Sequence, residues 1–402
     1  MKSLDAGIVG CGTAGQAAAL FLARQGHRVT LYERVAEPGP VGAGIILQPS
    51  GLAVLAELGL LAPVLARGAP LDNLRCVNPR QRTVIDLRYR DLCEGWFGLG
   101  LHRGVLFDTL FAAVRASSDI TLKTGVGVVS REQLDAHELV VLCDGARSQL
   151  RDGSPLVKKS IPYPWGALWF VADDPERRFD RELYQVVNGT HRLLGLLPTG
   201  LGVDGTTAKV SLFWSIRADR VDAFRSGRFA EWKAEVLAYA PGAAPVLEQI
   251  RTASDLLFSD YQDVVMRPWH ERNTVYLGDC AHATSPQLGQ GCNLALCDAR
   301  QLAVSLASHQ KLDAALANYS RSRRAHLGWY QFASRWLTPG FQSDHGWLAP
   351  LRDLFMPVLC RFPLSRQLML ATMAGISRGP LRALLPVERE ALRASENVSL
   401  PC

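Results

Sequence analysis

The stretch "AGIVGCGTAGQAAALFLARQGHRVTLYE", residues 6–33, decides the fold. Residues 6–9 predict a short buried strand, and a glycine turn then leads into a nearly all-apolar helix over residues 13–25. Gly26 ends this helix, and a second strand follows over residues 28–32. A strand, a helix and a second strand in this order form a βαβ unit, which is typical of α/β proteins.

The three glycines of this stretch have separate tasks in a dinucleotide-binding turn. Gly10 makes the tight turn, Gly12 lets the backbone approach a pyrophosphate, and Gly15 lets helix and strand pack closely. The helix N-terminus adds unpaired N–H groups and a partial positive charge. Glu33 follows 18 residues after Gly15, where a carboxylate accepts hydrogen bonds from an adenosine ribose. This context favours a dinucleotide over a glycine-rich packing turn, but the motif by itself does not distinguish FAD from NAD.

The length and composition predict a globular protein. With 402 residues, 48% of them apolar, the chain can bury a large core and form two or three domains. Charged residues such as Glu57 and Arg67 interrupt its longest apolar stretches, so none reaches the roughly 20 residues that span a bilayer. The start of the chain lacks the apolar region of a signal peptide, and the nine scattered cysteines favour reduced thiols. We therefore expect a cytoplasmic protein.

The net charge of +6 suits acidic substrates, anionic cofactors or a membrane surface, and charge alone does not choose among them. Arginines cluster at Arg321, Arg323 and Arg324, where a solvated helix face is favoured over nucleic-acid binding. We therefore expect no nucleic-acid partner. A metal is not expected either, because no tight C-x-x-C pair stands among the four neighbouring candidate ligands. These are Cys280, His282, Cys292 and Cys297.

Two later stretches carry similar strand-to-turn patterns. In "NTVYLGDCAHATSPQLGQGCN", residues 273–293, a strand leads to Asp279, and a glycine-containing loop precedes a helix that begins near Asn293. A strand-end aspartate can bind a polyol hydroxyl group, and glycines before a helix bring backbone N–H groups against a flat anionic ring edge. In "ELVVLCDGARSQLR", residues 138–151, a third buried strand ends at Asp144.

The three motifs, in this order and at these separations, resemble those of the single-component FAD-dependent aromatic hydroxylases of the para-hydroxybenzoate hydroxylase fold. The resemblance covers about residues 5–335 and implies an α/β fold. Its parts are a Rossmann-like FAD-binding domain, an inserted mixed or antiparallel β-sheet substrate domain and a helical C-terminal segment. The expected boundaries are 1–72, 101–158 and 268–335 for the FAD-binding domain, 73–100 and 159–267 for the substrate domain, and 336–402 for the C-terminal segment.

The resemblance also implies roles for single residues. Glu33 would hold the adenosine ribose, Arg103 would lie over the phosphates or the ribityl chain, and Asp279 would contact the ribityl chain. Asp144 would anchor a second fingerprint near FAD and NAD(P)H, and a surface ion pair with Arg151 is the alternative. Residues from Pro286 to Asn293 would run beside the isoalloxazine. The full set of implied FAD-binding residues is Gly10, Gly12, Ala14, Gly15, Glu33, Arg34, Arg103, Asp144, Asp279, Pro286, Gly289, Gly291, Cys292 and Asn293.

Two cysteines depart from the family pattern, and no catalytic residue is assigned. The family usually has alanine at the position of Cys143 and another small residue at Cys280. His282, beside the third motif, is a candidate for proton transfer, but a structural histidine is favoured.

Only one G-x-G-x-x-G stands in the context that the motif needs. Enzymes that hold NADPH throughout the cycle usually carry a second fingerprint, so NADH or NADPH is expected as a transient co-substrate beside a tightly bound FAD. The resemblance implies that reduced FAD reacts with O2 and that a flavin C4a-hydroperoxide hydroxylates an electron-rich aromatic small molecule, phenolic or polyketide-like. A role in secondary metabolism is expected.

Alternating patterns over residues 73–100 and 160–267 predict a sheet laid over the flavin. Within it, Val210, Leu212 and Trp214 share one face, and Lys209, Ser211 and Phe213 share the other. Residues 217–250 follow a helical pattern. Core packing is favoured for each single aromatic residue of this region, but five residues are candidate pocket walls. These are Trp165, Trp169, Tyr184, His191 and Trp214.

The stretch over residues 319–375 mixes aromatic and aliphatic residues with arginines. It is similar to the C-terminal pattern of the ubiquinone-biosynthesis hydroxylases at Leu351–Asp353 and Gly375, which implies a lipophilic substrate and a peripheral membrane contact. A helical cap over the substrate pocket or a dimer face is favoured over the membrane contact, because no segment shows the strongly one-sided apolar face of a surface-lying helix, and the oligomeric state stays open. Four prolines are expected to divide the stretch into short helices: Pro339, Pro350, Pro357 and Pro363.

Three functions follow from these patterns. The leading one is an FAD-dependent monooxygenase. A flavin-dependent reductase or halogenase of a lipophilic substrate is the second, although "PYPWGALWF" lacks the W-x-W-x-I-P spacing expected of halogenases. A non-redox flavin-fold binding protein, similar to the escort proteins of prenylated GTPases, is the third. Asp279 and the glycines after it speak against this third function.

Overall fold

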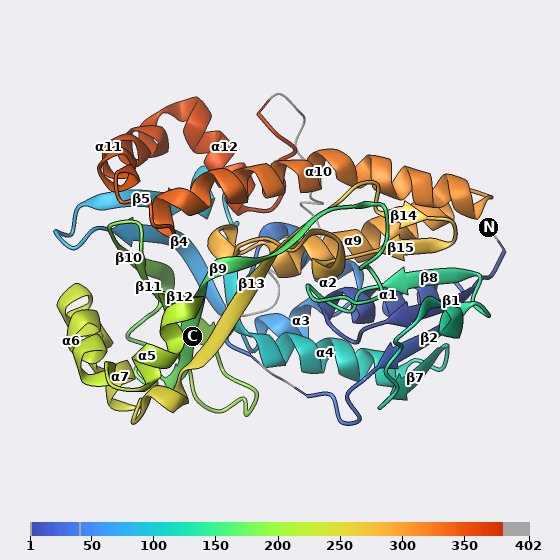
Figure 1. Ribbon diagram of the computed structural model, residues 1–402, viewed down its shortest axis with the longest axis horizontal. Coiled ribbons are helices and arrows are strands. Elements are labelled where there is room, and N and C mark those ends of the chain that lie inside the picture. Colours follow the sequence, from blue (N-terminus) through green and yellow to red (C-terminus); the bar gives the residue numbers. More distant parts are fainter. Residues whose placement is uncertain (1, 40–41, 381–402) are drawn as a thin grey trace.

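A computed structural model describes residues 2–39 and 42–380 of the chain. Its strands form two sheets, and Figure 1 shows these sheets in separate halves of the molecule. The six-stranded sheet has the order β14-β15-β8-β1-β2-β7 and is parallel except for the edge strand β14. Its strands are β1 (Asp5–Val9), β2 (Arg28–Glu33), β7 (Ile120–Thr124), β8 (Leu139–Leu142), β14 (His270–Glu271) and β15 (Thr274–Tyr276).

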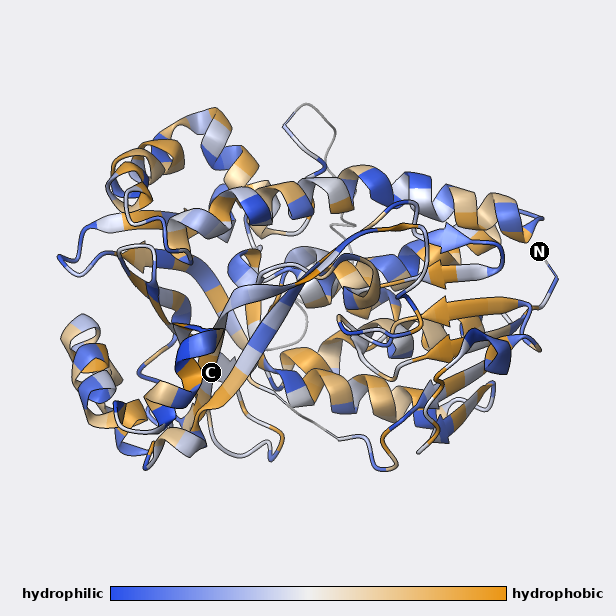
Figure 2. Ribbon diagram, viewed as in Figure 1, coloured by the Kyte–Doolittle hydropathy of each residue, from blue (hydrophilic) through white to orange (hydrophobic). Residues whose placement is uncertain are grey.

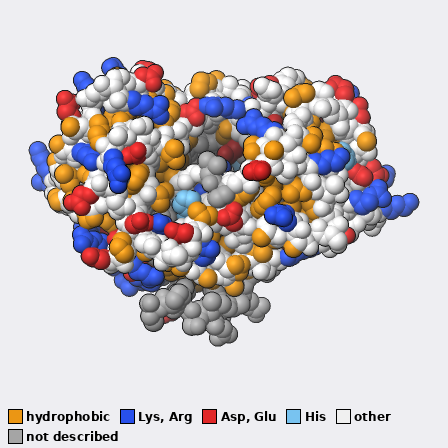
Figure 3. Space-filling view, turned by 90° about the horizontal axis from the view of Figure 1, so that it is seen from below, with side chains coloured by type: hydrophobic (Ala, Val, Ile, Leu, Met, Phe, Trp, Pro, Cys, Tyr) orange, Lys and Arg blue, Asp and Glu red, His pale blue; other side chains and the backbone are white. Residues whose placement is uncertain are grey.

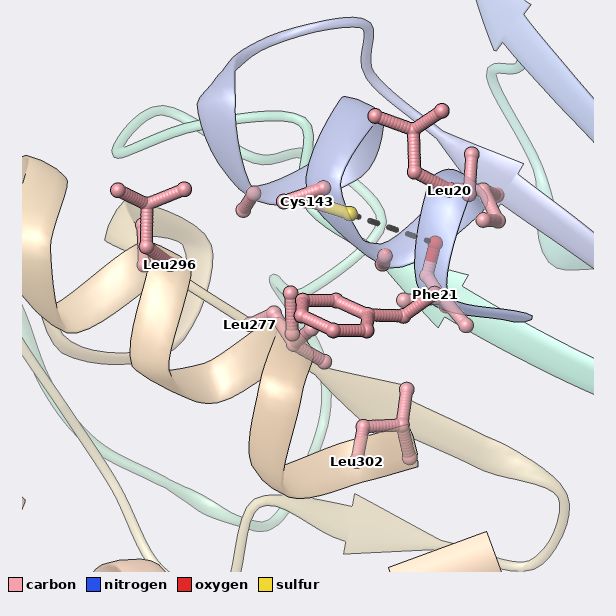
Figure 4. Packing of buried hydrophobic residues seen from close by; sticks show 14 of the residues in the cluster. Leu20, Phe21, Cys143, Leu277, Leu296 and Leu302 are labelled. Atoms are coloured by element: carbon pink, nitrogen blue, oxygen red, sulfur yellow. Dashed lines mark hydrogen bonds between the residues drawn. The ribbon is translucent and has the colours of Figure 1, made fainter. Parts of the chain in front are cut away.

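The opening βαβ unit is confirmed. Helix α1 (Thr13–Arg24) connects β1 to its parallel neighbour β2, with Ile8 opposite Leu31. The helix is apolar all round because Ala14–Ala23 are all buried between the sheet and helix α9 (Gly291–Ala307). Figure 4 shows Phe21 of α1 in one cluster with Leu277 and with Leu302 of α9. Burying such a side chain stabilises the fold by about 1.5–3 kcal/mol.

The second sheet has nine strands, eight of which form a continuous path. The path runs β13-β9-β12-β11-β10-β4-β6-β3, and β5 pairs with β4 outside it. The strands are β3 (Gly44–Leu47), β4 (Ala69–Val77), β5 (Thr83–Arg88), β6 (Gly98–His102), β9 (Val157–Asp173), β10 (Arg181–Asn188), β11 (Arg192–Gly200), β12 (Lys209–Arg217) and β13 (Leu257–Met266). This arrangement, a Rossmann-like half and a largely antiparallel half, confirms the predicted fold class. The domain boundaries remain a prediction.

The two faces of the nine-stranded sheet have different neighbours. On one face, Val210, Leu212 and Trp214 pack in a cluster with Trp232 of α6, as their alternation predicts. The helical pattern of residues 217–250 forms α5 (Val221–Arg225), α6 (Phe229–Tyr239) and α7 (Ala244–Glu248). The opposite face turns toward the six-stranded half and the C-terminal helices.

The remaining helices join and cover the two halves. Helix α10 runs along the length of the molecule in Figure 1, and Figure 2 shows hydrophobic residues in β8 of the six-stranded sheet and hydrophilic ones in the edge strand β14. Among the described residues, no helix has both the length and the apolar character needed to cross a bilayer. The helices not yet placed are α2 (Pro49–Glu57), α3 (Leu61–Leu65), α4 (Arg103–Ala116), α8 (Asp279–His282), α10 (Leu312–Phe341), α11 (Leu348–Arg361) and α12 (Pro363–Met373).

The prediction that four prolines divide the C-terminal stretch is wrong for three of them. Pro339 lies inside α10 and Pro357 lies inside α11, while Pro350 occupies the first turn of α11. Only Pro363 begins a new helix, α12. A proline in a first turn loses no helical hydrogen bond, and the buried Thr338 and Phe341 side chains hold the end of α10 in place around Pro339.

Candidate functional site

A cavity of about 450 Å³ lies between the two halves of the fold. One part of its lining comes from the β1–α1 turn and from residues 284–292 at the start of α9. The other part comes from strands β4 and β9–β13 of the nine-stranded sheet. The cavity is therefore bounded by the predicted dinucleotide turn on one side and by the predicted substrate sheet on the other.

The glycines of the first turn have the geometry that their motif predicts. Gly10 has φ +103°, which disfavours residues with a side chain. A Cβ atom on Gly15 would overlap the carbonyl oxygen of Gly10, so only glycine allows this helix to pack so close to the strand. A Cβ atom on Gly12 would meet nothing within 4 Å, and Gly12 lines the cavity. The backbone at Gly12 is thus open to approach by a ligand.

Glu33 lies at the end of β2 beside this turn. Its carboxylate accepts hydrogen bonds from the backbone N–H of Cys11 and of Val35, both at 2.9 Å. Burial, together with the neighbouring Glu33, raises the pKa of the Cys11 thiol to about 12. Glu33 itself does not line the cavity, and Arg34 is exposed on the outside. Their predicted contacts with the adenosine end of FAD remain predictions.

Arg103 and Asp144 occupy different surroundings. Arg103 is the first residue of α4, is exposed and lines the cavity, with its side chain next to Gly42. Asp144 follows β8, and its Oδ1 atom is buried without a hydrogen-bond partner among the described residues. An unpartnered buried carboxylate oxygen is costly unless a donor arrives, but Asp144 itself does not line the cavity, and its predicted place beside a bound nucleotide remains a prediction.

The alternative of an ion pair between Asp144 and Arg151 is wrong. The Arg151 side chain is 1% exposed and is directed elsewhere. Its Nη1 atom donates to the carbonyl oxygens of Ala146 at 2.9 Å and Cys280 at 3.1 Å. Its charge pairs with Asp152. Arg151 therefore joins the turn after β8 to the loop of Asp279, two segments that are far apart in sequence.

A buried charged network holds the Asp279 loop. Asp298 of α9 is fully buried, and its Oδ2 atom accepts from the backbone N–H of Gly278 at 2.9 Å and lies 2.5 Å from Nε2 of His282. Its other oxygen accepts from Nε of Arg323 at 2.6 Å. Asp279 itself is exposed toward the cavity, which it lines together with His282. The network places Asp279 at the cavity edge and gives His282 the structural role that the sequence favoured.

The same network continues to the C-terminal helices. Arg323 donates to Nδ1 of His326, and Nε2 of His326 lies 2.8 Å from the carbonyl oxygen of Gly375. Burial and the charge of Arg323 lower the pKa of His326 well below its ordinary value, so this ring is neutral. The prediction of a solvated arginine face is therefore wrong for Arg323, which is buried, although Arg321 and Arg324 are exposed. The helical period turns one of the three arginines inward.

Residues 286–293 follow the prediction except for the last one. Pro286, Gly289, Gly291 and Cys292 line the cavity, at the start of α9. Asn293 is fully buried and does not line it. Its Oδ1 atom accepts from the backbone N–H of Gln48 at 2.8 Å, and its Nδ2 atom donates to the carbonyl oxygens of Ile46 and Gly289. Asn293 is thus a positioning residue that joins two loops of the cavity.

Only one of the five candidate pocket walls lines the cavity. Trp169 does so, and its ring lies 5.0 Å from that of Phe213, centroid to centroid. Trp214 and Tyr184 pack on the opposite face of the sheet, Trp165 is buried, and His191 is exposed. Phe213, Gln185 and Tyr261 line the cavity but were not among the candidates. Phe213 was recognisable from its alternation with Trp214, whereas no sequence signal marks Gln185 or Tyr261.

These donors and acceptors fit FAD. The open backbone at Gly12 and the N–H groups at the start of α1 suit a pyrophosphate, and Arg103 adds a positive charge. The Asp279 carboxylate suits hydroxyl groups, and Gly291 begins α9 at the cavity surface. Within the described part of the chain, no group of three or more His, Cys, Asp or Glu residues has the arrangement of a metal site.

Comparisons with known proteins agree with the fold and with FAD as the cofactor. A family model described as an FAD binding domain matches residues 3–103 and 111–329. The chain is 28% identical over 345 residues to a probable 2-heptyl-3-hydroxy-4(1H)-quinolone synthase of Rhodococcus erythropolis, covering 81% of this chain and 85% of the relative. It is 26% identical over 338 residues to a putative FAD-dependent monooxygenase, YetM, of Bacillus subtilis, covering 79% and 88%. The crystal structure of PqsL, a probable FAD-dependent monooxygenase from Pseudomonas aeruginosa, superposes with a TM-score of 0.75 at 21% identity over 89% of this chain and 100% of that chain.

Proposed function

The chain belongs to the FAD binding domain family and is an FAD-dependent monooxygenase, and we propose that its substrate is a small aromatic compound that lies against Trp169 and Phe213. One observation carries the proposal. A single cavity is lined both by the glycine turns that suit FAD and by the aromatic wall of the second sheet. The alternative functions, a reductase, a halogenase or a non-redox binding protein, gain no support from the relatives.

The FAD that these residues would hold would supply the activation of O2, with electrons from NADH or NADPH, by which one oxygen atom enters a C–H bond of the ring and the other leaves as water. The chain's own residues would bind and orient the cofactor and the substrate and shield the reacting atoms from water. The start of α9 at Gly291 places the positive end of a helix at the cavity, which stabilises negative charge on a ring edge bound there. The aromatic and aliphatic side chains of the sheet keep water from the reacting atoms.

Oxygen incorporation tests this function. Purified protein is expected to show flavin absorbance and to oxidise NADH or NADPH with O2 uptake when a suitable phenol or quinolone is present. The product is expected to gain one oxygen atom, labelled when the reaction runs under labelled O2 and unlabelled when the label is in water. A colourless protein that added FAD does not reconstitute would contradict the function, as would a product whose new oxygen comes from water.

The partners beyond substrate and O2 are also proposals. Figure 3 shows basic side chains interspersed with acidic ones on the face that it presents, and the absence of a nucleic-acid partner remains an expectation. We further propose that α11 contacts a membrane surface. One face of this helix exposes large apolar side chains at helical spacing, and its opposite face, with Met356 and Cys360, is buried. The exposed set is Trp347, Leu351, Leu354, Phe355, Val358 and Phe362.

Vesicle binding tests this contact. Trp347 and Arg361 lie near the two ends of the exposed face, and tryptophan rings and arginine stems are suited to the lipid interface. The protein is expected to sediment with vesicles of phosphatidylcholine and phosphatidylglycerol, and Phe355→Glu is expected to lower the bound fraction about 10-fold. The matched control is Val129→Glu, at a residue that is 72% exposed outside these helices. Equal binding of both variants, or a dimer that Phe355→Glu dissociates without vesicles, would contradict a membrane contact.

A further inference from the structure

The wall that strands β4 and β9–β13 contribute to the cavity has a chemical character of its own, and we call it the substrate wall. Among its described lining residues there is no Asp, Glu, Lys, Arg or His. The charged or basic side chains of the cavity, Arg103, Asp279 and His282, all belong to the segments that suit FAD. A ligand that rests on the substrate wall therefore meets no countercharge from it.

The apolar part of the substrate wall is suited to a flat ring. The rings of Trp169 and Phe213 lie 5.0 Å apart at an angle of 40°. Leu183 and Leu197 lie beside them in the lining and form a small cluster with Leu71. Aromatic side chains of this kind attract another ring through dispersion and through offset or edge contacts.

The substrate wall has five polar side chains, and two of them, Asn73 and Ser215, are already engaged, whereas the side chains of Gln185 and Ser259 have no hydrogen bond within the described part of the chain. The Nδ2 atom of Asn73 donates to Glu182 at 2.7 Å. The Oγ atom of Ser215 accepts from the backbone N–H of Leu193 at 2.8 Å and donates to the carbonyl oxygen of His191. These groups hold the sheet together and are not free to recognise a ligand without losing those bonds.

Among the unpaired side chains of the substrate wall, Tyr261 is the one whose polar group is fully buried. Its hydroxyl oxygen is buried, and no hydrogen bond of ordinary geometry reaches it among the described residues. The residue falls at the register shift between Asp260 and Gln262 in the pairing of β13 with β9. Ser259, two residues earlier on β13, also lines the cavity, so the alternation of this strand directs both side chains to the same face. Burial raises the pKa of the Tyr261 hydroxyl to about 12, and the polar contact of the neighbouring Trp169 side chain lowers this pKa only in part. The hydroxyl therefore remains protonated and can donate a hydrogen bond.

We propose that the substrate is an uncharged aromatic compound with an oxygen acceptor, a hydroxyl or carbonyl group, which accepts a hydrogen bond from the Tyr261 hydroxyl while the ring lies on Trp169 and Phe213. This inference rests on the proposed function and names its substrate class. A ring with a carboxylate is disfavoured on the substrate wall, because a charge buried there without a countercharge is more costly than a neutral oxygen that is hydrogen-bonded.

Three ligands of one ring system test the substrate class: naphthalene, 2-naphthol and 6-hydroxy-2-naphthoate. Their dissociation constants are measured by calorimetry with the FAD-loaded protein, without NADH or NADPH, so no turnover is needed. We expect 2-naphthol to bind about 100-fold more tightly than the naphthoate, since the unpaired carboxylate must be desolvated. Binding of the naphthoate as tightly as 2-naphthol would overturn the proposal. That failure would leave the monooxygenase itself standing, because oxygen incorporation tests it separately.

The Tyr261→Phe variant tests the hydrogen bond. This variant is expected to bind 2-naphthol about 5-fold to 10-fold more weakly and to bind naphthalene with unchanged affinity, because only 2-naphthol has a hydrogen-bond acceptor. Tyr184→Phe is the matched control, since Tyr184 packs on the opposite face of the sheet and its hydroxyl bonds to Gln81. Equal losses for 2-naphthol and naphthalene in Tyr261→Phe would assign Tyr261 to packing alone and overturn its role as donor.

Discussion

Replacing Asp298 with alanine is expected to lower the free energy of unfolding by about 3–5 kcal/mol, because the variant leaves the guanidinium of Arg323 buried without its carboxylate. The backbone N–H of Gly278 loses its acceptor as well. Since Gly278 precedes Asp279, FAD affinity is expected to fall together with stability. Urea unfolding followed by tryptophan fluorescence gives the first quantity, and titration with FAD gives the second.

The pH dependence of stability provides a second measurement on the same residue. Burial acts to raise the pKa of the Asp298 carboxyl, but His282 and Arg323 outweigh it and hold the pKa at about 2, below its ordinary value of 3.8. The carboxylate therefore contributes stability that is present above about pH 4 and is lost as the pH falls through about 2. The stability difference between wild type and Asp298→Asn is expected to shrink over this range.

An exposed ion pair serves as the control for Asp298. Asp72 pairs with Arg181 at 2.6 Å, but both side chains are about half exposed. Asp72→Ala is expected to change the free energy of unfolding by less than about 1 kcal/mol. A similarly small change in Asp298→Ala would show that the buried network does not hold the fold in the way its geometry indicates.

The parts of the fold that the sequence predicted are those with a local cause. The turn of Gly10, Gly12 and Gly15 depends on conformational freedom and close approach within six residues, and both are readable from residue type. The strand before it and the helix after it follow from an uninterrupted apolar period. The same logic correctly separated the two faces of β12, with Trp214 on one side and Phe213 on the other.

The parts that the sequence did not predict depend on which segments meet. Asp298 and Arg323 lie on different helices, and only the packing of α9 against α10 brings them into contact. Tyr261 shares one face of β13 with Ser259, and only the way the two halves of the fold meet shows that this face lines the cavity. Asn293 was matched by position to a ligand-binding motif, but the structure uses its amide to join loops.

Replacing Gly12 with valine is expected to separate cofactor binding from folding. Gly12 has φ −80° and ψ −172°, a conformation that valine adopts readily, and a Cβ atom there meets nothing within 4 Å. The FAD-free variant is therefore expected to unfold at the same urea concentration as the FAD-free wild type. The valine side chain would occupy the space through which a pyrophosphate approaches the N–H groups of α1. Losing one or two charge-assisted hydrogen bonds is expected to lower the affinity for FAD about 10-fold to 100-fold.

Two other glycines make this prediction specific. Gly227 is exposed in the connection between α5 and α6, and a Cβ atom there also meets nothing within 4 Å, so Gly227→Val is expected to change neither stability nor FAD affinity. Gly15→Val should instead destabilise the FAD-free protein, because its side chain would collide with the carbonyl oxygen of Gly10. If Gly12→Val bound FAD as tightly as wild type, the pyrophosphate would have to lie elsewhere, and the assignment of this turn to FAD would fail. The same added side chain enters the ligand's space at Gly12 and collides with the protein's own backbone at Gly15. Comparing the two variants therefore tests whether the pyrophosphate binds at this turn.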